Sequence, residues 1–226
     1  MAVRDFPRLL AVVALAAGCA SAPSGSYYPP SANPATAQMA HTLHRAASAA
    51  GDDPSRYSFG FIQSPVAAAY SDEDATFYVT DGLMRLPAPV VDAAVAHEVA
   101  HEVLGHVNSR RALALTLSAG FGAAGLVAPG AGLLDFVVNP LAVRAFSRRQ
   151  ELAADQKAVE ILRAMGHAAP RRTLADALRT IDGVSPRPKE QLSGVLSTHP
   201  SLDDRLAALE PLEPGPSPVA IVGPAR

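Results

Sequence analysis

Apolar residues recur along this chain with more than one period, and each period predicts a different kind of element. The clearest pattern is a valine at every fourth position, which predicts a helix over roughly 88–108 with one buried face; its members are Val91, Val95, Val99 and Val103. Start and stop signals, such as Asn33 and Pro34 before an apolar stretch and Gly51 after it, predict further helices. Their ranges are 34–50, 139–165, 170–182 and 201–210.

Three short runs of strand-forming residues lie between the first helix and the valine-rich helix, at 57–63, 66–70 and 75–80. The acidic turn 71–74 predicts that the last two runs form a hairpin. We therefore expect an α+β fold that is mainly α, with a small β-sheet.

The amino-terminal residues have the layout of a secretory signal peptide, which we assign to residues 1–18. A basic start is followed by the apolar run 9–17, too short to span a bilayer, which needs about 20 residues. The single cysteine of the chain, Cys19, cannot form an intrachain disulfide. The sequence Leu-Ala-Ala-Gly-Cys at 15–19 resembles the lipobox of bacterial lipoproteins, which implies lipidation of Cys19 and, with Ala20 after it, the outer membrane. The alternative is an ordinary signal peptide with an incidental cysteine.

Composition divides the rest of the chain. A Pro/Ser-rich stretch predicts a tether over 19–36, and a Pro-rich end predicts a disordered tail over 211–226, leaving a folded domain over 37–210. Residues 112–134 carry no charge, so they are either a transmembrane helix or a pair of small-residue helices packed near the active site, and their glycines favour the pair.

Charge and aromatic content exclude one class of partner. The net charge is −2, no basic patch is evident, and aromatic residues are 5% of the chain with no tryptophan. Because nucleic-acid binding relies on basic surfaces and aromatic stacking, we expect no nucleic-acid partner.

The candidate chemistry lies on the valine-rich helix, in the segment His97-Glu98-Val99-Ala100-His101. Two histidines four residues apart point the same way from a helix, with the separation that zinc ligands need. Glu98, beside the first histidine, can act as the general base for a nucleophilic water. A buried structural pair of histidines is the alternative, but it gives Glu98 no role.

A catalytic zinc site needs a third protein ligand, and Glu151 is the candidate on the next helix. Asp155 lies one turn further on the same face, and its carboxylate can accept a hydrogen bond from the other ring N–H of a ligating histidine. These two acids can instead be exposed surface residues. His106 is nine residues after His97, which on a continuous helix rotates it about 180° away, so we expect it to face away from the site.

Four segments resemble the HtpX/CAAX-prenyl-protease family of zinc metallopeptidases, in its periplasmic lipoprotein branch: 91–106, 151–155, 76–83 and 198–205. The resemblance implies a gluzincin-like domain with the sheet beside the active-site helix, one zinc ion held by His97, His101 and Glu151, and Glu98 as base. It also implies that 75–80 is an edge strand on which an extended peptide pairs. His199 is implied near the open metal position, and Arg205 beside Asp155 or Glu151.

The resemblance implies a zinc endopeptidase that hydrolyses unfolded or misassembled envelope proteins. It would be lipid-anchored at Cys19 in the periplasm, at the outer membrane of a Gram-negative bacterium. The alternatives are a lipoprotein chaperone or assembly factor with an occluded or vestigial zinc site, and an integral membrane protease.

Overall fold

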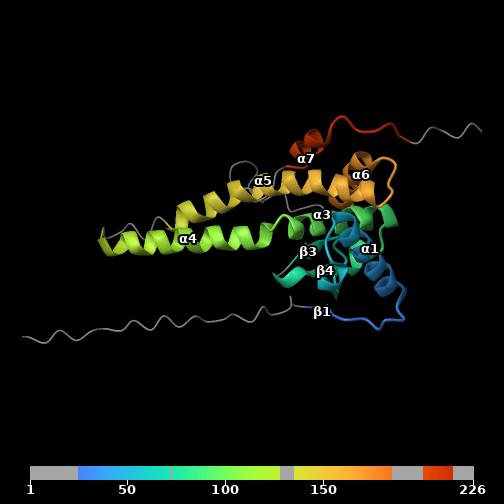
Figure 1. Cartoon of the computed structure of the whole chain (residues 1–226), viewed down its shortest axis with the longest axis horizontal. Coiled ribbons are helices and arrows are strands. Elements are labelled where there is room, and N and C mark those ends of the chain that lie inside the picture. The colour runs from blue at the N-terminus through green and yellow to red at the C-terminus, as the bar shows by residue number, and fades with distance from the viewer. Residues whose placement is uncertain (1–24, 72, 128–134, 185–200, 216–226) are drawn as a thin grey trace, which may run out of the picture.

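The computed structural model describes residues 25–71, 73–127, 135–184 and 201–215 (Figure 1). Its fold is mainly α-helical with a small mixed sheet, which confirms the predicted fold class. The helices are α1 (Pro34–Ala50), α2 (Asp81–Met84), α3 (Ala88–Val103), α4 (His106–Val127), α5 (Asp135–Ala164), α6 (Pro170–Val184) and α7 (Leu202–Leu209). The strands are β1 (Ser26–Tyr27), β2 (Ser58–Ile62), β3 (Ala69–Ser71) and β4 (Thr76–Thr80), with 3₁₀ turns η1 (Pro54–Arg56) and η2 (Glu73–Ala75).

Local capping signals set several helix ends as predicted. Asn33 caps α1 by accepting a hydrogen bond from the Ala35 amide, and Gly51 ends α1 in the left-handed conformation. Ser201 and Asp204 form the predicted capping box of α7. These ends follow from residues within one helical turn, so they could be read from sequence.

Helix α3 is the central element of the core. It contacts α1, α5, α6 and β3. Val91, Val95 and Val99 are at most 1% exposed, and burying each such side chain contributes about 1.5–3 kcal/mol. The last valine of the stripe, Val103, is only partly buried because the helix ends there. Burial of the rest of the stripe fixes the rotation of α3, and with it the direction in which its histidines point.

The sheet has the order β1-β2-β4-β3, so β4 lies inside it. Strand β4 pairs in parallel with β2 and antiparallel with β3, as the predicted hairpin requires. The expectation that 75–80 is a free edge is therefore wrong, because 69–71 folds back and occupies the outer side of β4. Among the described strands, β1 and β3 form the edges of the sheet.

A close backbone contact fixes the turn that leads from β4 into α2. The Gly82 amide donates a hydrogen bond to the Ser64 carbonyl at 2.9 Å. A Cβ atom at this position would lie 2.3 Å from the carbonyl oxygen of Pro65, so only glycine fits.

Helices α4 and α5 run side by side and extend beyond the rest of the domain (Figure 1). The part of the uncharged stretch that the structure describes, 112–127, lies in α4, and α5 begins at Asp135, earlier than the predicted 139. No helix within the described ranges has an apolar stretch long enough to cross a bilayer.

Packed structure extends beyond the predicted domain at both ends of the described chain. Ser26 and Tyr27, assigned to the tether, form β1 against β2, and the Tyr27 hydroxyl donates to Asp81. Beyond α7, the Glu213 carboxylate accepts hydrogen bonds from the backbone amides of Arg171 and Arg172 at the start of α6. Such pairings between distant segments leave no periodic signal in the sequence, so composition alone suggested free ends.

Candidate metal centre

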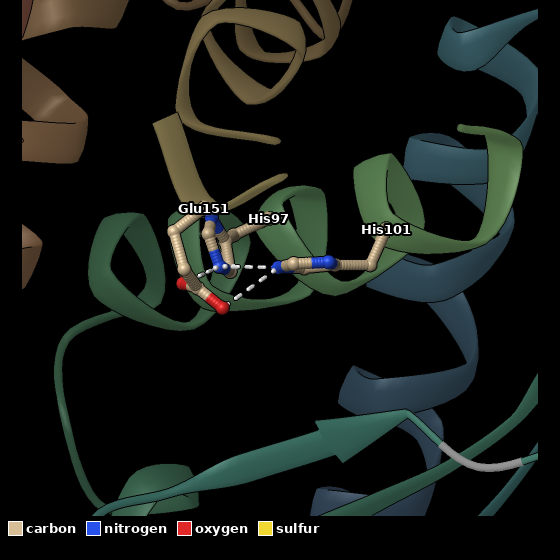
Figure 2. A group of neighbouring side chains, drawn as sticks. All are labelled: His97, His101 and Glu151. Atoms are coloured by element: carbon tan, nitrogen blue, oxygen red, sulfur yellow. Dashed lines mark hydrogen bonds and ion pairs between the residues drawn. The ribbon is translucent and has the colours of Figure 1, made fainter. Parts of the chain in front are cut away.

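Helices α3 and α5 bring three buried side chains to one point. Figure 2 shows His97 and His101 on successive turns of α3 and Glu151 reaching them from α5. All three residues are 9% exposed or less. The i, i+4 spacing of the histidines aligns them on one face, and the valine stripe beside that face keeps it inside the fold.

The donor groups of the three residues form a small triangle, in which each histidine faces a different oxygen of the Glu151 carboxylate. The Nε2 atoms of His97 and His101 are 3.1 Å apart, and they lie 3.3 and 3.5 Å from the two carboxylate oxygens of Glu151. Ligands held at about 2.0–2.1 Å by a tetrahedral zinc ion are about 3.3–3.4 Å from each other. Two imidazole nitrogens and a carboxylate at this spacing therefore fit a zinc ion.

A carboxylate and a guanidinium group lie on the Nδ1 side of the His97 ring. Its Nδ1 atom lies 3.0 Å from Oδ1 of Asp155. Arg205 on α7 donates two hydrogen bonds to the same carboxylate, Nε to Oδ2 at 2.8 Å and Nη2 to Oδ1 at 2.5 Å. The structure thus places Arg205 beside Asp155, so that α7 is joined to the centre through this pair.

The electrostatics of this group favour positive charge at His97. Burial lowers the pKa of His97, but the hydrogen bonds to Asp155 and Glu151 outweigh it and raise the pKa to about 9. Burial raises the pKa of Asp155, but the Arg205 and His97 partners outweigh burial and hold it below its usual value. An environment that favours a proton on this imidazole also favours a bound cation.

His106 lies against the metal centre, contrary to the sequence prediction that it faces away. The prediction assumed one helix over 88–108, whereas α3 ends at Val103 and α4 begins at His106. Gly105, with a φ of +64°, interrupts the helix between them, so the rotation expected of one continuous helix does not apply to His106. His106 is consequently 7% exposed, and its Nδ1 atom lies 3.0 Å from Nδ1 of His101. Gly105 is the signal in the sequence that identifies the break.

The remaining predicted residues occupy different positions. Glu98 follows His97 on α3, is partly buried, and forms no hydrogen bond or ion pair with any residue in the described part of the chain. His199 and Cys19 lie outside the described residues.

Comparison with known proteins gives consistent matches over most of the chain. The model of the family described as Peptidase family M48 matches residues 33–213. Two "Protease HtpX homolog" proteins from Streptococcus equi subsp. zooepidemicus, strains MGCS10565 and H70, are 27% identical over 202 residues, covering 70% of this chain and 65% of each relative. A protein of the same description from Acaryochloris marina (strain MBIC 11017) is 30% identical over 190 residues, covering 67% of this chain and 64% of the relative. The matched region therefore spans slightly less than two thirds of these relatives.

Proposed function

The chain belongs to peptidase family M48, and on that premise we propose that it is a zinc-dependent endopeptidase that cleaves unfolded or misassembled proteins of the bacterial envelope. Metallopeptidases of this family depend on zinc. The observation that carries the proposal is the buried triangle of His97, His101 and Glu151 with zinc-ligand spacing, beside a carboxylate, Glu98, that is not a member of the triangle.

His97 and His101 would hold the metal through their Nε2 atoms, and Glu151 through the carboxylate that faces them. When bound, zinc polarises the scissile carbonyl group and makes water acidic enough to act as a nucleophile near neutral pH. Because three protein ligands leave one position of a tetrahedral ion open, the donor set suits a catalytic site better than a structural one.

Glu98 is the proposed general base and acid. Its carboxylate takes the proton of the attacking water and then passes it to the nitrogen of the leaving amine, so one group serves both halves of the hydrolysis. Its position next to His97, the first proposed ligand on α3, supports this role.

Asp155 and Arg205 are proposed to position His97 rather than to react. A carboxylate 3.0 Å from Nδ1 fixes the tautomer in which Nε2 carries the lone pair, and Arg205 keeps that carboxylate charged and oriented. For His199, whose position is not described, we propose a place near the open metal position, as an oxyanion stabiliser, a substrate contact or an occluding ligand.

We also propose that the protein acts in the periplasm, anchored to the outer membrane through lipid on Cys19. The apolar run 9–17 and the Leu-Ala-Ala-Gly-Cys sequence at 15–19 support this location. An enzyme held in that compartment would meet envelope proteins before they have folded or assembled.

The test compares the chain from residue 19 onward, carrying Cys19→Ser, with the same chain carrying Glu98→Gln. Both are expected to bind one zinc ion, and only the first should cleave casein. Glu160→Gln is the matched control, since the Glu160 side chain on α5 is 62% exposed and pairs with Lys157 rather than with any proposed ligand. Equal casein cleavage by the Glu98→Gln protein would refute the role of Glu98. Zinc binding without cleavage by either protein would favour the chaperone alternative.

A further inference from the structure

The two proposed histidine ligands have different kinds of partner at Nδ1, the ring nitrogen that is not in the ligand set. His97 has the Asp155 carboxylate at its Nδ1, whereas His101 has the imidazole of His106. The rings of His101 and His106 meet edge to face, with centroids 5.0 Å apart and an angle of 71° between their planes. His101 is 3% and His106 7% exposed, so water has little access to this contact.

The geometry of the centre determines which nitrogen of His101 faces the metal position and which carries the proton. Its Nε2 atom belongs to the donor triangle, 3.1 Å from Nε2 of His97 and 3.5 Å from the Glu151 carboxylate. A neutral imidazole that offers its Nε2 lone pair to a metal carries its proton on Nδ1. The Nδ1–H group of His101 therefore points at His106, 3.0 Å away, and needs an acceptor there.

We propose that His106 is a positioning residue for the metal centre. Its Nδ1 atom accepts the Nδ1–H hydrogen bond of His101 and thereby holds His101 in the tautomer and orientation that present Nε2 to zinc. The inference rests on the proposed function only insofar as the triangle binds zinc, and it holds whether or not the protein cleaves peptides.

The main chain around His106 is itself tied to the helix that carries the third ligand. The Gln150 side chain, 5% exposed, donates through Nε2 to the carbonyl oxygen of His106 at 3.3 Å. Gln150 immediately precedes Glu151, so one contact links the start of α4 to the position of the carboxylate ligand. Gly105 makes this arrangement possible, since its left-handed conformation breaks the helix between His101 and His106.

A histidine buried for packing alone is the competing explanation, and two substitutions separate it from the proposal. His106→Leu keeps an apolar side chain in the space but removes the acceptor. His106→Asn is smaller but keeps an acceptor oxygen close to the position of Nδ1. A packing role predicts that leucine is the better substitute, whereas the hydrogen-bonding role predicts that asparagine is.

The experiment measures zinc affinity by competition with a chromogenic chelator, on the chain from residue 19 onward with Cys19→Ser. We expect His106→Leu to weaken zinc binding by about 10–100-fold, as losing such a partner does in other zinc sites. His106→Asn should restore most of the affinity. His44→Leu, at an exposed histidine of α1, is the control and should bind zinc as the unsubstituted chain does.

Unchanged affinity in His106→Leu, or affinity as weak in a folded His106→Asn as in His106→Leu, would overturn the proposal. A ¹⁵N-histidine NMR spectrum of the zinc-loaded chain provides a test that needs no stable variant: His101 should carry its proton on Nδ1, and a proton on Nε2 would contradict the inference. Failure of the proposed function would show differently, as absent casein cleavage with these zinc affinities intact.

Discussion

Oδ1 of Asp155 lies 3.0 Å from Nδ1 of His97, on the opposite side of the ring from the Nε2 atom that meets Glu151. Asp155 and Glu151 are one turn apart on α5, so a single helix face supplies both a proposed ligand and the residue that orients another ligand. The packing of α5 against α3 thus determines the geometry of the metal centre through two contacts, one made by Glu151 and one by Asp155.

Asp155→Asn tests the orienting contact. The amide can still hydrogen-bond, but it loses the charge that favours the zinc-binding form of His97, so zinc affinity should fall by about 10–100-fold. Chelator competition measures this loss. Asp203→Asn, at an exposed acid of α7, should leave the affinity unchanged, and an equal loss in both variants would contradict a specific role for Asp155.

Arg205→Ala should destabilise the fold as well as the site. The side chains of Arg205 and Asp155 are 11% and 1% exposed, so removing the arginine breaks a buried ion pair and leaves His97 as the remaining described cation beside Asp155, at a cost of up to about 3–5 kcal/mol. Urea unfolding of the zinc-free protein measures the change. The double variant Arg205→Ala, Asp155→Asn should recover part of the loss, because the buried charge of Asp155 is then removed together with that of its partner, and purely additive losses would contradict this coupling.

Zinc removal should lower the thermal stability of the folded chain. A ligand that binds only the native state at about 1,000 times its Kd stabilises it by about 4 kcal/mol. EDTA should therefore lower Tm, and added zinc should restore it. Glu151→Gln should largely remove this response, whereas Glu98→Gln should keep it, since Glu98 is not proposed as a ligand. A zinc response that survives in Glu151→Gln would disprove the ligand assignment.

Gly82→Ala should destabilise the turn between β4 and α2. Its Cβ would lie 2.3 Å from a backbone oxygen of Pro65, so the chain must shift, with an expected loss of about 1–3 kcal/mol. Gly120→Ala is the opposite case, because it lies within α4 and a Cβ there meets no atom within 4 Å. It should stabilise by up to about 1 kcal/mol. Chemical unfolding measures the free energy of unfolding of both variants. Similar changes in this free energy for the two would exclude the steric explanation.

Cys19→Ser in the full chain tests the proposed anchor. The unsubstituted protein should fractionate with the outer membrane and carry lipid on its amino-terminal peptide, as seen by mass spectrometry. The variant should lack the lipid and leave the outer-membrane fraction. Ser21→Ala should change neither property, and a variant that stays at the outer membrane would argue against a lipid anchor on Cys19.

Local periodicity determined much of this protein from sequence alone. The spacing of His97 and His101, and of Glu151 and Asp155, fixes each pair on one helix face because 3.6 residues make a turn in any α-helix. The valine stripe likewise fixed the buried face of α3, and the capping residues fixed the ends of α1 and α7. All of these features depend on residues within a few positions of one another.

Only the tertiary structure decided the features that depend on chain direction between elements. The break at Gly105 brings His106 against His101 instead of away from it, and the parallel pairing of β2 with β4, added to the predicted hairpin with β3, places β4 inside the sheet. Arg205 meets Asp155 across 50 residues of chain. Such contacts are selected by the packing of whole elements, whose energies are summed over many distant residues. A local signal such as Gly105 can therefore mark a break in a helix, but it does not specify which residues meet across that break.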